Sequence, residues 1–280
     1  MSRRRTELVA LARLDVHEVL RSRWPVAVVL LYSALAALLV FAALRESNVL
    51  GFTGTGRVLL SFAHGLLLLL PLLALSATGQ TLNRAREEGA LELLFGHPVS
   101  PGGYYAAVTL VRYGLLLVPL AAILLALPAI TWATLGDPIP WAYLGRALAI
   151  GAALLWAFTG LGMALSAYVT SQARAAILVL LVWAGAVALV DFALIAVMLQ
   201  WRLHAGTAFF LAALNPVQCA RMALISGQDP ELATFGPVGF FLAQRFGAGG
   251  LFALGIGWPV VAGTLAWLAG RARFRRGDLV

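Results

Sequence analysis

Soft metal ligands are the first side chains in this sequence that could carry chemistry. Cys219 and Met222 are three residues apart, and His204 precedes them in the same segment. Thiolate, thioether and imidazole groups are ligands that suit copper, so this trio could hold a copper ion on the outer side of a membrane. Cys-x-x-Met in one helix is a weak signal, and ordinary packing is the favoured interpretation. We therefore expect no metal site in this chain.

An acid inside a long apolar run is the second candidate. Asp191 lies between two apolar residues, and Arg112 and His64 are similar but weaker cases. A charge at the bilayer centre costs roughly 2.5–3.5 kcal/mol on insertion scales, so Asp191 should face the protein interior or water. Its expected partner is Arg112, or a hydroxyl or backbone group on another span. Two roles stay open, namely a pathway or switch residue and a polar clamp between helices or subunits.

The third candidate is a short charged stretch between two long apolar runs. It reads R-A-R-E-E-G-A-L-E-L-L-F-G-H-P-V-S, residues 84–100; Gly89 interrupts it, and Gly96 and Pro98 end it. The helix dipole favours acids near the start of a helix, and the acids here are Glu87, Glu88 and Glu92. The stretch therefore predicts a short helix with an acidic beginning.

One side of that predicted helix is apolar. Leu91, Leu94 and Phe95 fall at i, i+3 and i+4, which is the spacing of one helix face. Flanked by two membrane spans, the helix is expected to lie on the cytoplasmic surface and to present this side to another protein. The alternative is a solvated loop that only turns the chain.

The chain lacks the residues that nucleotide-binding and hydrolytic sites need. All twenty basic residues are arginine, whereas a P-loop uses a lysine to reach the β- and γ-phosphates. No G-x-S-x-G or H-E-x-x-H motif occurs. We therefore predict that the chain is not an enzyme, binds no cofactor itself, and receives any nucleotide energy through another subunit.

The composition is that of an integral membrane protein. Apolar residues make up 61% of the 280 residues and charged residues 11%, with a mean hydropathy of +0.91. The net charge of +8 comes from arginines beside apolar runs, where the positive-inside rule places them. This distribution favours a membrane surface over nucleic acid as the partner of the basic residues.

Six apolar runs near the ~20 residues needed to cross a bilayer predict an all-α protein with six spans. Their approximate bounds are 24–44, 58–77, 106–130, 147–168, 176–199 and 250–270. Residues 1–23 combine six arginines with apolar residues at helical spacing, which predicts an amphipathic helix at the cytoplasmic interface, in contact with anionic lipid. The predicted inner segments hold about twice as many arginines as the outer ones, so both termini are expected inside.

A long outer segment, residues 200–249, is not uniformly polar. Apolar runs at 208–214, 217–225 and 235–246 are separated by turn signals, of which Asn215-Pro216 is the clearest. We expect two short helices that re-enter the outer leaflet or lie on it. A seventh span is the competing interpretation, but the runs are too short for it.

Residues 84–100 resemble a segment of permease subunits of type 2 ABC transporters, whose consensus there is close to E-x-E-x-G-T-L-E-x-L-L-x-x-P-V-S. The matching residues are Glu88, Gly89, Leu91, Glu92, Leu94, Pro98, Val99 and Ser100. Ala90 stands where that family has threonine. In that family the segment is the coupling helix, which docks into a groove on an ATP-binding subunit. The resemblance implies such a subunit, carrying ATP and magnesium, and a homodimer of this chain. The implied contacts with the subunit are made by Glu87, Glu88, Gly89, Leu91, Glu92, Leu94, Phe95 and Pro98.

Three further motifs are similar to the NosY subfamily of these permeases. They are R-S-R-W at 21–24, V-D-F-A-L at 190–194 and L-N-P-V-Q-C-A-R at 214–221, where Gln218 replaces an aspartate of the subfamily. The resemblance implies work in the bacterial or archaeal cytoplasmic membrane for maturation of the copper-sulfur centre of nitrous oxide reductase. It also implies a periplasmic β-helix partner near Asn215, Pro216 and Arg221.

Other functions remain open at this point. The same fold would serve an exporter of a lipid, drug or other small molecule, for which a large apolar lateral opening would be the sign. An ion-coupled secondary transporter would need an ion site of its own, and Asp191 is the single candidate. Inverted repeats would support this interpretation, but residues 1–130 and 147–280 show no convincing similarity. A membrane scaffold is the last alternative.

Overall fold

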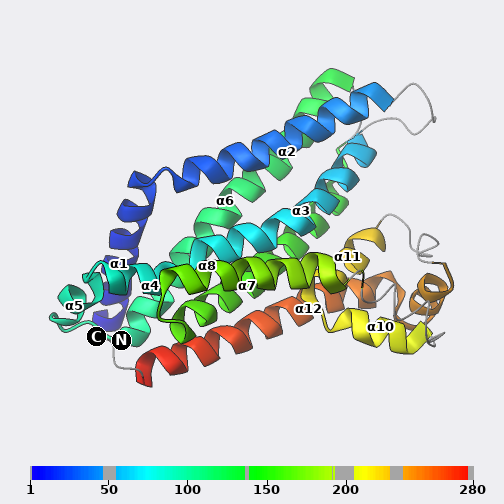
Figure 1. Cartoon of the computed structure of the whole chain (residues 1–280). Helices are drawn as coiled ribbons and strands as arrows, with labels where there is room; N and C mark the ends of the chain where they lie inside the picture. The colour runs from blue at the N-terminus through cyan, green and yellow to red at the C-terminus, as the bar shows by residue number, and fades with distance from the viewer. Residues whose placement is uncertain are drawn as a thin grey trace.

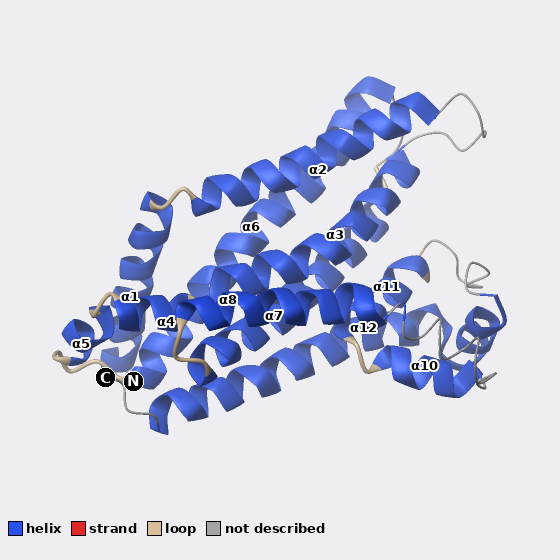
Figure 2. Ribbon diagram, in the orientation of Figure 1, coloured by secondary structure: helices blue, strands red, loops and turns tan. Residues whose placement is uncertain are grey.

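The computed structural model describes residues 2–46, 55–135, 139–190, 192, 205–227 and 236–276. Within these ranges the regular structure is helical and contains no strand (Figure 2). The elements are α1 Ser2–Arg21, α2 Trp24–Glu46, α3 Thr55–Thr78, α4 Thr81–Glu87, α5 Ala90–Phe95, α6 Pro101–Leu135, α7 Trp141–Tyr168, α8 Gln172–Ala184, the π-helix η1 Gly185–Leu189, α10 Ala205–Ala213, α11 Pro216–Ile225 and α12 Gly236–Arg276. The prediction of an all-α chain is confirmed for the described residues.

Five helical stretches among the described residues are long and apolar enough to cross a membrane. They are Ala63–Glu87, Pro101–Ile130, Trp141–Tyr168, Gln172–Leu189 and Gln244–Arg276. A sixth candidate is the bent pair Leu8–Arg21 and Trp24–Leu38, which passes the same test jointly. Each of the six predicted spans therefore coincides, wholly or in part, with a helix.

The helices extend past the bounds that hydropathy predicts. α6 begins at Pro101 where residue 106 was expected, and α12 continues to Arg276 where residue 270 was expected. An apolar run marks only the part of a helix that crosses ~30 Å of hydrocarbon, whereas the backbone hydrogen bonds continue into the headgroup region. Within α12 the backbone leaves helical geometry at Gly247, which has φ 63°, so the first three turns form a separate outer helix.

The bundle is organised around α7, which contacts α12, α3, α6 and α11. Most of the α7 side chains are buried, while α8 and α12 expose much of their apolar surface. The beginning of α1, the end of α12 and the short helices α4 and α5 lie together at one end of the bundle, and α10 and α11 lie at the other (Figure 1). An even number of spans requires that the first and the last helix have their terminal ends on the same side of the membrane, as they do here.

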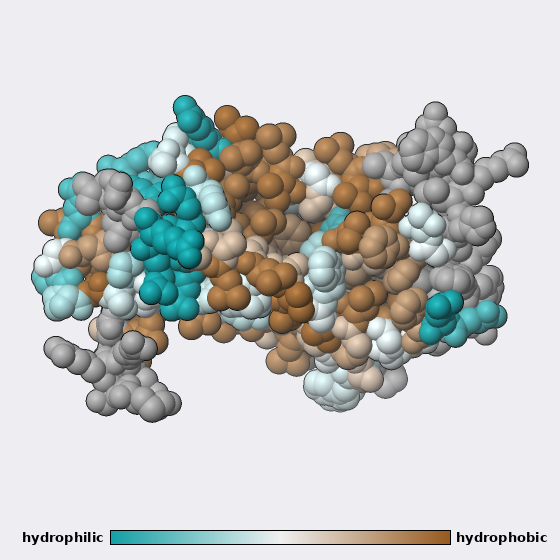
Figure 3. Space-filling view, turned by 90° about the horizontal axis from the view of Figure 1, so that it is seen from below, coloured by the Kyte–Doolittle hydropathy of each residue, from teal (hydrophilic) through white to brown (hydrophobic). Residues whose placement is uncertain are grey.

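The surface is apolar along the middle of the bundle. In Figure 3 hydrophobic residues cover the central part of the face that is shown, and most of the hydrophilic residues gather at the end that holds α1, α4 and α5. A belt of apolar side chains between polar ends suits the hydrocarbon of a bilayer and its two headgroup layers. The end that holds α1, α4 and α5 is therefore the more strongly charged of the two ends outside the apolar belt.

The first helix, α1, is bent away from α2 and buries one of its sides against the bundle. α1 and α2 are bent by 66° across their junction, as a separate interfacial helix requires. Leu11, Asp15 and Val19 fall at i, i+4 and i+8 and are all buried, while Leu14 and Leu20 are exposed. The contacts of α1 are chiefly with α6. The helix therefore buries one narrow stripe that includes an acid.

Arg146 fixes the outer end of the bundle. Its guanidinium donates hydrogen bonds to Ala223 O, Ser226 Oγ and Ala248 O over 2.9–3.1 Å. It also lies over the ring of Phe252, 4.6 Å from its centroid. These contacts join α7, the end of α11 and the break in α12, so the short outer helices are packed parts of the fold.

Candidate functional site

The charged stretch forms two short helices. α4 ends at Glu87 and α5 begins at Ala90, with Gly89 between them at φ 69° in the left-handed region. Glu87 and Glu88 therefore close α4, and Glu92 is the acid in the first turn of α5. The expectation of one helix with three acids at its start is corrected, because a left-handed glycine divides the stretch after the second acid.

The two acids that close α4 have different partners. Glu87 Oε1 accepts a hydrogen bond of 2.9 Å from the backbone N–H of Gln172, the first residue of α8. A carboxylate at a helix N-terminus satisfies an orphan donor and complements the helix dipole. Glu88 instead pairs with Arg84 at 2.8 Å on the exposed side of α4. Any movement of α4 is therefore linked to the start of α8 through Glu87.

The apolar side of α5 faces the chain itself. Leu91 is 1% exposed and packs with Leu82, Tyr105 and Phe274. Phe95 is half-buried against Tyr104, with the ring centroids 6.1 Å apart in an edge-to-face arrangement. The expectation that this side meets another protein is wrong for Leu91, because the apolar face of a six-residue helix must be covered for the helix to hold its place.

A different edge of α5 is free to meet a partner. Leu93 is 76% exposed, and Glu92, His97 and Pro98 around it are exposed as well. Leu94 is half-buried. An exposed leucine with an acid beside it, held by the buried Leu91 two residues earlier, can enter a groove on a second protein. The part of the stretch that is available for docking is therefore the Glu92–Leu93 edge.

Replacing Gly89 with alanine is expected to destabilise the chain by about 1 kcal/mol, because an L-residue in the left-handed region is strained. No atom lies within 4 Å of the added Cβ, so the effect comes from the backbone alone. Denaturant unfolding in detergent measures it. Gly114→Ala is the matched control, since that glycine lies within α6 with the same open space; equal effects of the two changes would contradict the prediction.

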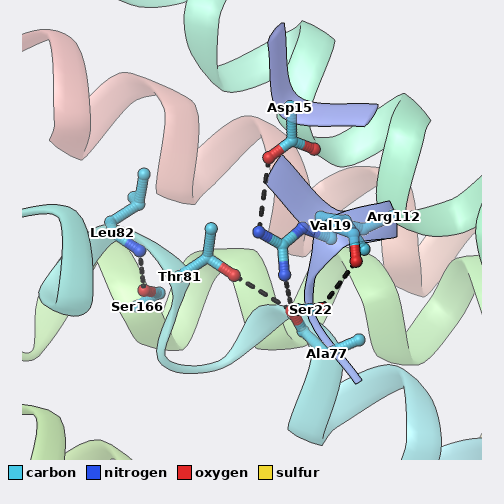
Figure 4. Close-up of polar contacts among 8 residues, drawn as sticks. All are labelled: Asp15, Val19, Ser22, Ala77, Thr81, Leu82, Arg112 and Ser166. Atoms are coloured by element: carbon cyan, nitrogen blue, oxygen red, sulfur yellow. Dashed lines mark hydrogen bonds and ion pairs between the residues drawn. The ribbon is translucent and has the colours of Figure 1, made fainter. Parts of the chain in front are cut away.

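Arg112 meets a partner that the sequence did not suggest. Its Nη2 lies 3.3 Å from Asp15 Oδ1, and its Nη1 donates to Ala77 O at 3.2 Å (Figure 4). The two side chains are 16% and 8% exposed. Burial raises the pKa of Asp15, and the neighbouring guanidinium opposes that shift. The pair joins α1, α6 and the end of α3. The predicted pairing of Arg112 with Asp191 involves a residue outside the described ranges and stays a prediction. The i, i+4 spacing of Asp15 from Leu11 and Val19 indicates that Asp15 shares their buried side of α1, but it does not indicate Arg112 as the partner.

The other intramembrane candidates are only partly within the described residues. Asp191 and His204 lie outside them, and His64 is half-buried within α3. Cys219 is buried, and its thiol donates to Ala213 O at 3.1 Å. Burial also raises the pKa of this thiol, which disfavours the thiolate that a metal needs. The described residues hold no group of three or more His, Cys, Asp or Glu that could bind a metal.

The Asn-Pro boundary has a structural role. Asn215 is buried and caps α11, because its Oδ1 accepts from Val217 N–H at 2.9 Å while its Nδ2 donates to Ala186 O in η1. Pro216 takes the first helical position, where its missing N–H is not needed. The predicted partner contact near Asn215 stays a prediction. Arg221, on the same helix, is half-buried.

Long apolar helices around α7, with a charged hairpin at one end, define a multi-pass α-helical membrane protein. The family model described as "ABC-2 family transporter protein" matches residues 9–279, and the chain belongs to this family. Two relatives carry the name "Probable ABC transporter permease protein NosY". The one from Stutzerimonas stutzeri is 27% identical over 270 residues, covering 94% of this chain and 97% of the relative. The one from Pseudomonas aeruginosa is 28% identical over 272 residues, covering 92% and 90%. The resemblance to type 2 ABC permeases and to NosY is thereby confirmed.

Proposed function

We propose that this permease works in the cytoplasmic (inner) membrane as one of two copies paired with a separate ATP-binding cassette subunit. That subunit binds and hydrolyses ATP with Mg²⁺, and the permease couples the hydrolysis to maturation of the copper-sulfur centre of nitrous oxide reductase. A periplasmic, NosD-like β-helix protein is the proposed partner at the outer end. The similarity to NosY over nearly the whole chain is the observation that carries this proposal.

The geometry of the α4–α5 hairpin supports coupling. The Glu92–Leu93 edge is exposed, while Leu91 fixes α5 to Phe274 of α12 and Glu87 fixes α4 to the start of α8. A displacement of the α4–α5 hairpin would therefore be transmitted to α12 through Leu91 and to α8 through Glu87. Nucleotide in the partner can then bias two packings of the bundle, which is how a ligand shifts a conformational equilibrium.

The outer end supports a protein partner there. Phe210, Leu211 and Leu214 are exposed on or beside α10, and Arg146 donates hydrogen bonds to the end of the neighbouring α11. Exposed apolar residues on a fixed support are typical of binding sites. Purification of the chain in mild detergent, followed by mass spectrometry, tests both partners. An ATP-binding subunit together with a β-helix protein is the expected result, whereas an ATP-binding subunit alone would favour an exporter of a small molecule.

Leu93→Asp is expected to reduce the co-purified ATP-binding subunit about tenfold, because losing one central apolar contact of an interface costs about 1–2 kcal/mol or more. The exposed position means that the chain itself should fold normally. Quantitative mass spectrometry of the purified complex measures the ratio of the two subunits.

Two variants sharpen this test. Thr170→Asp introduces the same charge at an exposed position in the α7–α8 turn and should leave the ratio unchanged. Leu91→Asp buries a charge within the α5 anchor and should lower the yield of folded chain. An unchanged subunit ratio for Leu93→Asp would remove α5 from the proposed interface.

A further inference from the structure

A polar cavity of about 270 Å³ lies where α1 meets the bundle. Its walls come from α1, the start of α2, the α3–α4 junction, α5, α6 and the first residue of α8. Asp15 and Arg112 form part of the wall, and the end of α3 with Ala77 closes it nearby (Figure 4). At about 30 Å³ per water molecule in the liquid, the space suits a polar group much larger than a single ion.

The buried pair in this wall has unused hydrogen-bonding capacity. Asp15 Oδ1 meets Arg112, but Asp15 Oδ2 and Arg112 Nε are buried without a hydrogen-bond partner among the described residues. Asp15 is 7% exposed. An unpaired buried polar group costs about 1–3 kcal/mol. A donor beside Asp15 and an acceptor beside Arg112 would therefore both be stabilising.

The charges around the cavity include both signs with an excess of acid. Three carboxylates line it, from Asp15, Glu18 and Glu88, against the guanidiniums of Arg84 and Arg112. Arg112 pairs with Asp15, and Arg84 pairs with Glu88. Glu18 is the carboxylate of the wall that takes part in neither of these two ion pairs. Such a wall favours a ligand with an ammonium group that meets the acids and an anionic group that meets a guanidinium.

The position of the cavity along the membrane normal indicates where such a ligand would come from. Ser22, at the bend between α1 and α2, and Trp24, the first residue of α2, both line it. The junction of an interfacial helix with a spanning helix lies at the level of the lipid headgroups, where tryptophan is enriched. A phospholipid headgroup is present at that depth at high local concentration.

We propose that this cavity binds the headgroup of a zwitterionic phospholipid with a primary ammonium, the chemistry of phosphatidylethanolamine. The ammonium donates to the carboxylates of Asp15 and Glu18, and a phosphate oxygen accepts from the Arg112 guanidinium. Phosphatidylcholine has the same charges but no ammonium N–H to donate. Binding would fill the space between α1 and α5, and so hold the interfacial helix in register with the α4–α5 hairpin.

The test uses the full chain, purified with its native partners into nanodiscs of equal phosphatidylethanolamine, phosphatidylcholine and phosphatidylglycerol. Native mass spectrometry then measures which lipid stays bound after gentle activation. We expect retention of phosphatidylethanolamine over phosphatidylcholine, and an approximately tenfold loss of that preference in Glu18→Gln and Asp15→Asn, the change expected for one charge-assisted hydrogen bond. Glu18 is exposed, so its variant should fold normally.

A matched control distinguishes this cavity from lipid binding elsewhere on the chain. Arg174→Gln changes the charge of an exposed residue of α8 that does not line the cavity and should retain the lipid preference. Equal retention of phosphatidylethanolamine and phosphatidylcholine would overturn the proposal, as would a preference for phosphatidylglycerol or a preference unaffected by Glu18→Gln. Soluble phosphoethanolamine binding with no retained lipid would also overturn it, since the ligand would then be a free metabolite of the same chemistry.

Discussion

Replacing Arg112 with methionine is expected to destabilise the chain by about 3–5 kcal/mol, the cost of removing one partner of a buried ion pair. The reason lies in the residue that stays behind. Asp15 would keep its buried position against α6 without a cation beside it, and it would have to take up a proton or draw α1 away from the bundle. Denaturant unfolding of the detergent-solubilised chain measures the loss.

A double-mutant cycle separates the ion pair from the packing. Asp15→Leu together with Arg112→Met removes both charges. The double variant should recover most of the stability lost in Arg112→Met, because replacing a whole buried ion pair by apolar residues often leaves the stability unchanged or raises it. Arg84→Met breaks the pair with Glu88, whose side chains are 64% and 53% exposed, and should cost at most about 1 kcal/mol. An Arg112→Met effect no larger than that of Arg84→Met would show that the contact contributes little.

Elements that depend on local sequence were predictable. Apolar runs located the spans, the Asn-Pro boundary located the start of α11, and the motif at residues 84–100 located the α4–α5 hairpin. Each of these signals lies within about twenty residues of chain, and each acts through hydrophobicity, capping or a glycine. The same motif carried the family resemblance, which the match to residues 9–279 confirms.

Contacts between distant segments were not predictable from the same patterns. The pairing of Asp15 with Arg112 joins residues 97 positions apart, and an acid in a basic N-terminal helix is expected to face water. Leu91 was assigned to a partner because its spacing shows that a face is apolar, but spacing does not show what covers that face. No local pattern marks Arg146 as a structural residue, because its backbone and hydroxyl acceptors come from two later segments of the chain.

The close packing of α7 against α12 depends on glycines, among them Gly160 and Gly263, that no sequence motif indicated. A Cβ added at Gly263 would lie 2.6 Å from Ala157 Cα and 2.8 Å from Trp156 O, and one added at Gly160 would meet the backbone of Gly263. These are backbone atoms, which cannot rotate out of the way. Small residues at such crossings allow helices in membranes to pack closely, so the central contact of the bundle requires glycine here.

Gly263→Ala is therefore expected to destabilise the chain by about 1–3 kcal/mol, and Gly263→Val by more, because each forces the two helices apart. Gly257→Ala is the control on the same helix: its Cβ meets nothing within 4 Å, and alanine should stabilise a helix interior by about 0.5–1 kcal/mol relative to glycine. Denaturant unfolding in detergent compares the three. Opposite signs for Gly263→Ala and Gly257→Ala would establish close helix contact as the cause, since helix propensity alone predicts the same sign for both; equal signs would mean that α7 and α12 tolerate separation.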